Sequence, residues 1–304
     1  MKEKLGCLIT ILFFTFYAST QQAFGNHSQA DSVLTLIKQA KGVEKLKLLD
    51  KHVSLFLSSP ELIAPIEEKA IKEKDHLLIA YAYRFRIYGL SKKDENDSIR
   101  FYLNLMDEEL ALYEQTKKHI TGEEKTRYRS IKSTLATMKV EQFLMKGLYD
   151  LALVEINEML SQSKLDNDLL SERQAYVYLG MMYVNTEKWD KALLNFQEAY
   201  AINEVMLKAN KPKLSIYSYF PAMEGILLSN EKLGQHKQAI VIADSLLNRI
   251  ERDFKSIETP NNEDLFLYYY CLNRVNSLSA LSFMKTNQLK EARMKLDEIK
   301  QFIR

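Results

Sequence analysis

Residues 175–201 constrain the fold of this chain more than any other stretch of its sequence. Their large apolar side chains recur three, four or seven positions apart, which is the spacing of one face of an amphipathic helix. The face of the first helix holds Tyr176, Leu179 and Tyr183, and that of the second, after a short polar segment, holds Trp189 and Phe196. Small residues on the same faces leave room for the rings of the facing helix: Gly180, Ala192 and Ala199. The stretch therefore predicts two helices packed closely as a hairpin.

Together these residues form the pattern aromatic-x2-Leu-Gly-x2-Tyr followed by Ala-x3-Phe. With this pattern the stretch resembles the tetratricopeptide (TPR) repeat family. The resemblance implies an all-α, TPR-like solenoid of helical hairpins, wound as a right-handed superhelix. It also implies that the partner is a protein or a peptide, because such arrays usually bind other proteins and carry out no chemistry.

Weaker relatives of this unit align on the alanine of the second helix. The best repeat covers residues 173–206, and the weaker hairpins lie near 133–163, 216–252 and 264–303. Their alanines, which are 40, 47 and 53 residues apart, are Ala152, Ala192, Ala239 and Ala292. The period of the family is about 34 residues. Longer helices and polar connectors account for the excess, so we expect hairpins that stack with irregular spacing.

The fifth residue before each alanine is expected in a tight turn between two helices. Gly147, Gly234 and Asn287 tolerate the left-handed backbone conformation that such a turn often requires. Glu187 departs from this preference, although it lies in the best-matching unit.

The first half of the chain has helical periodicity without the motif. Apolar spacing predicts one helix over residues 43–57, and Ser59 before Pro60 resembles a cap followed by proline at the first helical position. Two more helices are expected over 77–89 and 98–118. Connectors are short, and nine glycines and five prolines are few for a sheet-rich chain. A single all-helical solenoid of about 11 or 12 helices over residues 26–304 is therefore expected.

The first 25 residues have the features of a secretory signal peptide. A short, net-positive start is followed by an apolar run over residues 5–18 and by small residues at Ala23 and Gly25. The run is shorter than the roughly 20 residues of a membrane-spanning helix. We expect cleavage after Gly25, a periplasmic location and no membrane insertion of the mature chain. An uncleaved N-terminal membrane anchor is the alternative.

Charge and cysteine content bear on the kind of partner and on disulfide formation. The formal net charge is +2, and removal of the first 25 residues lowers it by one. This balance does not favour nucleic acid or an anionic membrane as the partner. Only Cys271 remains after cleavage, so no intramolecular disulfide can form, and its apolar surroundings predict a buried, inert thiol.

No catalytic or metal-binding pattern is visible in the sequence. The five histidines are scattered, and none is four residues from another, as a helical metal pair requires. Glycine-rich phosphate loops and Gly-x-Ser-x-Gly motifs are missing from the sequence. We therefore expect no catalytic residues, no metal and no cofactor. His236 occupies the position that Trp189 fills in the best repeat, which favours a packing role.

The TPR resemblance implies a ligand surface on the concave side of the array, lined mainly by the first helix of each hairpin. Carried onto the best repeat, it implicates Gln174, Val177, Met181, and Val184 or Asn185. Family members that clamp a terminal carboxylate have an asparagine where this chain has Met181. The departure favours an apolar or extended-peptide surface.

A second group of candidate ligand residues comes from the aromatic stretch 265–270. Three consecutive tyrosines, 268–270, cannot all face the core from one helix. At least one is therefore expected to be exposed or to line a groove between hairpins, and Tyr268 and Tyr270 join the candidate ligand residues.

Three functions are compatible with these features. The first is an exported, non-enzymatic scaffold that binds proteins or peptides. The second is the extracytoplasmic sensor module of a truncated or split membrane-bound regulator, because a signal peptide with TPR hairpins looks like such regulators of Bacteroidetes-type bacteria. The end of the chain at Arg304 fits this interpretation and fits a stand-alone protein equally well. The third and most remote is an enzyme on a helical scaffold.

Overall fold

The computed structural model describes residues 27–91, 96–117, 120, 122–209, 216–260 and 262–301. The expected signal peptide, residues 1–25, lies outside this part of the chain. Every regular element of the described residues is a helix, which confirms the all-α prediction. The contacts divide these residues into two compact units, with the boundary between Gln142 and Phe143. We call them the N-terminal and the C-terminal unit and describe each by itself.

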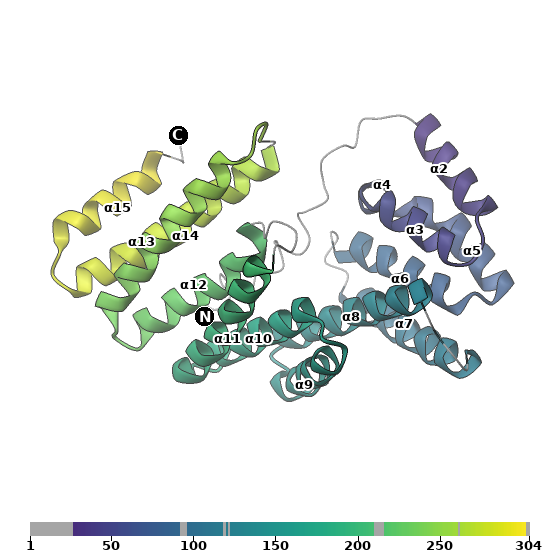
Figure 1. The fold of residues 1–304 in the computed structure, drawn as a ribbon, viewed down its shortest axis with the longest axis horizontal. Helices are drawn as coiled ribbons and strands as arrows, with labels where there is room; N and C mark the ends of the chain where they lie inside the picture. The colour runs from purple at the N-terminus through teal and green to yellow at the C-terminus, as the bar shows by residue number, and fades with distance from the viewer. Residues whose placement is uncertain are drawn as a thin grey trace. The chain divides into compact units, whose positions relative to one another are not determined.

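The helices of the N-terminal unit are α2 (His27–Gln39), α3 (Val43–Lys51), α4 (Val53–Ser58), the 3-10 helix η1 (Pro60–Ile63), α5 (Ala64–Glu73), α6 (His76–Ser91), α7 (Asn96–Thr116) and most of α8 (Gly122–Met145). The helices of the C-terminal unit are α9 (Tyr149–Asp166), α10 (Leu169–Asn185), α11 (Trp189–Lys208), α12 (Ile216–Lys232), α13 (His236–Lys255), α14 (Asn262–Lys285) and α15 (Leu289–Gln301) (Figure 1).

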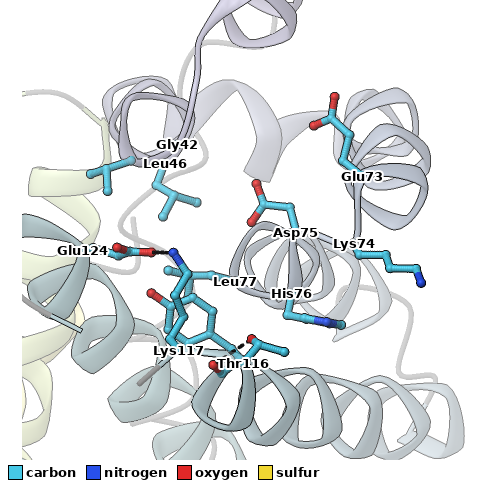
Figure 2. A pocket seen from close by; sticks show the side chains of 12 residues that line it. Gly42, Leu46, Glu73, Lys74, Asp75, His76, Leu77, Thr116, Lys117 and Glu124 are labelled. Atoms are coloured by element: carbon cyan, nitrogen blue, oxygen red, sulfur yellow. Dashed lines mark hydrogen bonds and ion pairs between the residues drawn. The ribbon is translucent and has the colours of Figure 1, made fainter. Parts of the chain in front are cut away.

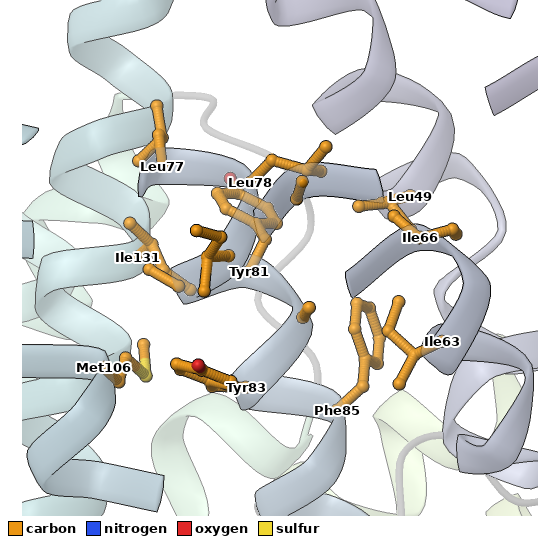
Figure 3. Close-up of a cluster of buried hydrophobic side chains, with 14 of the residues drawn as sticks. Leu49, Ile63, Ile66, Leu77, Leu78, Tyr81, Tyr83, Phe85, Met106 and Ile131 are labelled. Carbon is orange, nitrogen blue, oxygen red and sulfur yellow. The ribbon is translucent and has the colours of Figure 1, made fainter. Parts of the chain in front are cut away.

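Helix α6 is the central helix of the N-terminal unit, packed against α3, α4, α5, η1 and α7. Its sequence is apolar at almost every position from Leu77 to Ile87, and a helix that is hydrophobic all round is a buried one. Phe85 lies toward Ile63 of η1, and Tyr83 lies toward Met106 of α7 (Figure 3). The expected helix over 77–89 is confirmed. Because it is apolar on all sides, it needs neighbours on all sides, and the surrounding helices bury it.

A buried arginine on α6 is compensated by its neighbours. The Nη2 of Arg84 donates to Oδ1 of Asp50 on α3 at 3.2 Å, and Asp50 also pairs with Arg127 of α8. The Arg84 guanidinium lies over the Tyr81 ring, 4.9 Å from its centroid. Because a buried charge is costly unless it is paired, this cluster fixes the position of α3 against α6.

The prediction of one helix over residues 43–57 is wrong in one respect, because the helix is broken at His52. Its two parts are α3 and α4, and the break presents Phe56 of α4 to Phe85 of α6, with ring centroids 5.4 Å apart. Pro60 begins the separate helix η1, as its fixed backbone angle allows, and the Ser59 side chain makes no capping hydrogen bond. These divisions raise the number of α-helices in the described residues to 14, against the 11 or 12 expected.

The C-terminal unit consists of consecutive helical hairpins. Helices α10 and α11, α12 and α13, and α14 and α15 pack as pairs (Figure 1). The end of α8 is joined to α9 by the same kind of turn, which makes α9 the second helix of a fourth hairpin. We call α10, α12 and α14 the first helices, and α9, α11, α13 and α15 the second helices. The first helices also pack directly on one another, α10 on α12 and α12 on α14. Each second helix also packs on the first helix of the next hairpin, α11 on α12 and α13 on α14, and both kinds of contact stack the hairpins.

The same turn joins the helices of all four hairpins. The fifth residue before each alanine has a positive φ of 71° at Gly147, 59° at Glu187, 75° at Gly234 and 60° at Asn287. The next backbone N–H then donates to the carbonyl five residues earlier, at 2.8–2.9 Å in each case. This is the Schellman pattern of helix termination. The turn prediction is confirmed, and Glu187 adopts the left-handed conformation despite its side chain.

Replacement of Glu187 by glycine is expected to stabilise the protein. A side chain in the left-handed region costs roughly 1–2 kcal/mol, part of which is offset by the greater backbone freedom that glycine has in the unfolded chain. We expect the free energy of unfolding, measured by urea titration, to rise by about 0.5–1 kcal/mol. The control is Lys188→Gly, because φ of Lys188 is −93° and glycine brings no relief there. An equal loss of stability in both variants would contradict the prediction.

Candidate functional site

One aromatic ring connects three helices of the C-terminal unit. Phe196 of α11 is buried, and a Cβ built on Gly180 of α10 would lie only 2.7 Å from its ring. A Cβ on Gly225 of α12 would lie 2.4 Å from the same ring. Two glycines on different first helices therefore accept opposite sides of one phenylalanine, and Ala192 and Ala199 of α11 are fully buried beside it. The C-terminal unit is a stack of TPR-like hairpins.

Polar side chains also connect the first helices. Buried Arg173 of α10 donates from Nη1 to Oδ1 of Asn203 on α11 (3.3 Å) and to the Ser218 carbonyl of α12 (2.8 Å). Burial lowers the pKa of this guanidinium. Glu224 of α12 accepts from Nε of Arg274 on α14 at 2.7 Å. These groups serve packing, because their partners are other helices of the same unit.

The residues that the TPR resemblance assigned to a ligand surface lie largely inside the unit. Val177, Met181 and Asn185 are 3, 5 and 7% exposed, Val184 is also buried, and Gln174 is half-buried. They belong to α10, whose neighbours α9, α11 and α12 pack closely around it. Their role in ligand binding stays a prediction, but the structure offers little free surface at these positions.

The three consecutive tyrosines of α14 differ in exposure, as their spacing predicts. Tyr269 is exposed, whereas Tyr268 and Tyr270 are half-buried. The Tyr268 ring stacks on Phe254 of α13 with centroids 4.0 Å apart, and the Tyr270 ring is 6.3 Å from that of Phe220 on α12. Both rings take part in contacts between helices, and α12 separates α14 from the candidates on α10 in the stack. The six candidate residues are therefore not brought together at one surface.

An open groove of the C-terminal unit lies between the second helices α11 and α13, with α12 as its floor. Its volume is about 1030 Å³. The residues that line it include Leu193 and Gln197 of α11, Asn230 of α12, and Lys237, Gln238 and Val241 of α13. One end is bridged by Arg249 of α13, whose Nη1 donates to Oε1 of Glu204 on α11 at 3.2 Å. The other end opens at the turn before α13, where Gly234, Gln235 and His236 line it.

The second helices share an exposed apolar position that the motif does not include, and one of its four members, Val241, lines the groove. In each second helix the residue two positions after the aligned alanine is large, apolar and exposed: Val154 (64%), Leu194 (58%), Val241 (62%) and Met294 (56%). Two helical positions correspond to about 200°, so these side chains point away from the hairpin that buries the alanine. The repetition is visible without a structure once the four alanines are aligned.

A second, smaller cavity of about 330 Å³ lies in the N-terminal unit, between the ends of α5 and α7 and the start of α3 (Figure 2). Several of its charged groups are already paired: Lys117 pairs with Glu124 at 3.0 Å, and Glu73 pairs with Lys45, outside the lining, at 2.8 Å. Burial and the nearby Glu124 raise the pKa of the Tyr113 hydroxyl, which keeps it neutral. The larger groove between α11 and α13 is therefore the better candidate site.

Reactive groups are few in the part of the chain that the structure covers. Cys271 is fully buried on α14, and burial raises the pKa of its thiol, which keeps the sulfur protonated and confirms the expectation of a buried thiol. Among the described residues no cluster of His, Cys, Asp and Glu could hold a metal ion. His236 is half-buried at the open end of the groove between α11 and α13.

Comparisons with known proteins add little to this description. No protein-family model matches the sequence, and no curated protein matches it. Among solved structures, the chain is similar to the nearly identical TPR-like repeats of a protein described as a kinesin light chain from Podosopora anserina. The sequences are 11% identical, the match covers 76% of this chain and 94% of the other, and the TM-score is 0.48. Because the sequence identity and the TM-score are both low, the fold assignment rests on the hairpins themselves.

A double-mutant cycle tests the contact between Phe196 and Gly225. Gly225→Ala pushes a methyl group into the ring, and overpacking of this kind typically costs about 1–3 kcal/mol. In a Phe196→Ala background, urea unfolding is expected to show most of that cost removed, because alanine lacks the Cγ and Cδ atoms that the new methyl group would meet. Gly147→Ala is the control: its Cβ meets nothing within 4 Å, so its cost comes from the backbone and does not change with Phe196→Ala. Strict additivity of Gly225→Ala and Phe196→Ala would contradict the assigned packing.

Proposed function

We propose that the protein is a non-enzymatic scaffold that binds proteins or peptides through the second helices of its C-terminal unit. The observation that carries this proposal is the exposed apolar residue at one equivalent position of four consecutive second helices. Single exposed apolar residues are ordinary on protein surfaces, but aligned ones typically belong to interaction sites. The packing of each hairpin is complete without them, so a partner gives the simplest reason for their presence.

Export of the scaffold is the second element of the proposal. It is supported by the charged start, the apolar run over residues 5–18 and the small residues Ala23 and Gly25. Within the described residues, no helix combines the length and the hydrophobicity needed to cross a membrane. A periplasmic location of the mature chain is the specific form of this proposal.

A sensor module of a membrane-bound regulator is the alternative function. The combination of a signal-peptide-like start with helical hairpins favours it. The DNA that follows codon 304 distinguishes the two, because an in-frame apolar segment of about 20 residues would indicate a regulator.

Partner binding is tested by capture from an envelope extract with immobilised residues 26–304. We expect proteins that crosslink to the wild-type chain to be reduced about ten-fold or more by Leu194→Asp combined with Val241→Asp, because buried carboxylates oppose an apolar interface. Leu165→Asp is the control, since Leu165 is also highly exposed but lies outside the repeated position. Quantitative mass spectrometry of the crosslinked proteins gives the ratio. Equal capture by all three chains would refute binding through the second helices.

Export predicts a shortened chain in the native host. We expect intact-mass measurement of the purified protein to show loss of residues 1–25, and fractionation to place it with periplasmic markers. Replacement of Leu12 by Arg is expected to retain the full-length protein in the cytoplasm, because a charge interrupts the apolar run. Full-length wild-type protein with Met1 to Gly25 present would disprove cleavage.

A further inference from the structure

We infer that the groove between α11 and α13 binds an extended peptide that combines apolar side chains with a carboxylate held at the start of α13. This inference rests on the proposed function and names the site and the chemistry of the partner. The site differs from the first-helix surface that the TPR resemblance implies, because it is built from second helices.

The floor and both walls of the groove supply apolar surface. Met223 and Ile226 of α12 form part of the floor, Leu193 lies on the α11 side, and Val241 and Ile242 lie on the α13 side. The groove is open along its length and is about 1030 Å³ in volume, which suits several side chains of an extended segment. Apolar contact therefore provides attraction that does not depend on a single pocket.

Four amide side chains line the same groove: Gln197, Asn230, Gln235 and Gln238. Each amide offers both a donor and an acceptor, which is also what each peptide unit offers. Asn230 is almost fully buried, and its Nδ2 donates to the Ile226 carbonyl at 2.8 Å, so the plane of this amide is fixed. A peptide backbone can use such amides, whereas the hydrocarbon chain of an anionic lipid cannot. This difference favours a peptide as the occupant.

The charge of the groove favours an anionic group. Its lining residues include no Asp or Glu, and they include Lys237. Lys237 lies in the first turn of α13, which contains no acidic residue, and the side chain of Gln235 makes no capping hydrogen bond. The free N–H groups of a helix start carry partial positive charge and bind carboxylates. Lys237 and the start of α13 thus act on the same end of the groove.

The second position of the four second helices holds an acidic residue in two of them and a lysine in the other two. The second residue of α9 is Asp150 and that of α11 is Asp190, both of which complement the helix dipole. Lys237 opposes the dipole of α13, and so does Lys290 at the second position of α15. Lys290 does not line the groove, so it provides a matched control for Lys237.

The test uses residues 26–304 and two fluorescein-labelled nonapeptides, one alternating leucine with glutamate and one alternating leucine with lysine. In fluorescence-anisotropy titrations we expect the leucine–glutamate peptide to bind and the leucine–lysine peptide to bind about ten-fold more weakly or not at all. Lys237→Asp is expected to weaken binding of the first peptide about ten-fold while leaving the melting temperature equal or higher. Lys290→Asp is expected to change the melting temperature in the same direction and to leave binding unchanged.

Three results would overturn the inference: equal binding of both peptides, an unchanged dissociation constant in Lys237→Asp, or displacement of the peptide by dodecanoate as effectively as by unlabelled peptide. The last result would identify an anionic amphiphile as the ligand. If the leucine–glutamate peptide fails to bind while capture of a partner still depends on Leu194 and Val241, the inference is wrong and the proposed scaffold stands. If capture fails as well, both are wrong.

Discussion

The contact of one phenylalanine ring with two glycines is the constraint on which the C-terminal unit depends. Phe196 fills the space that missing side chains at Gly180 and Gly225 leave open, so α10, α11 and α12 approach one another around a single ring. Once the first helices are this close, their side chains interlock, and residues such as Met181 become part of the core. The open surface lies elsewhere, in the groove that the second helices α11 and α13 leave between them.

The core of the N-terminal unit is built differently. It surrounds one helix, α6, that is apolar on all sides, and compensates the buried charge of Arg84 with Asp50. No repeat is needed for such an arrangement, which agrees with the missing motif in the first half of the sequence. The two halves are both helical, but their sequences encode different kinds of core.

Local rules made much of the fold predictable. Apolar spacing located the hairpins, and the aligned alanines located the turns, including the strained one at Glu187. The break at His52 escaped prediction because both parts continue one apolar face, and the preference for two helices comes from contacts with α6. The surface at α11 and α13 escaped for a related reason. Burial depends on how far neighbouring helices stand apart, and the periodicity of one helix does not contain that distance.

The Arg249–Glu204 bridge gives the groove between α11 and α13 two unlike ends. One end is closed by a strut between the helices, and the other opens beside the positively polarised start of α13. The two ends therefore differ in charge and in access. At one end an arginine and a glutamate are already paired, and the other end lies beside the N–H groups of a helix start, which have no partner within the helix.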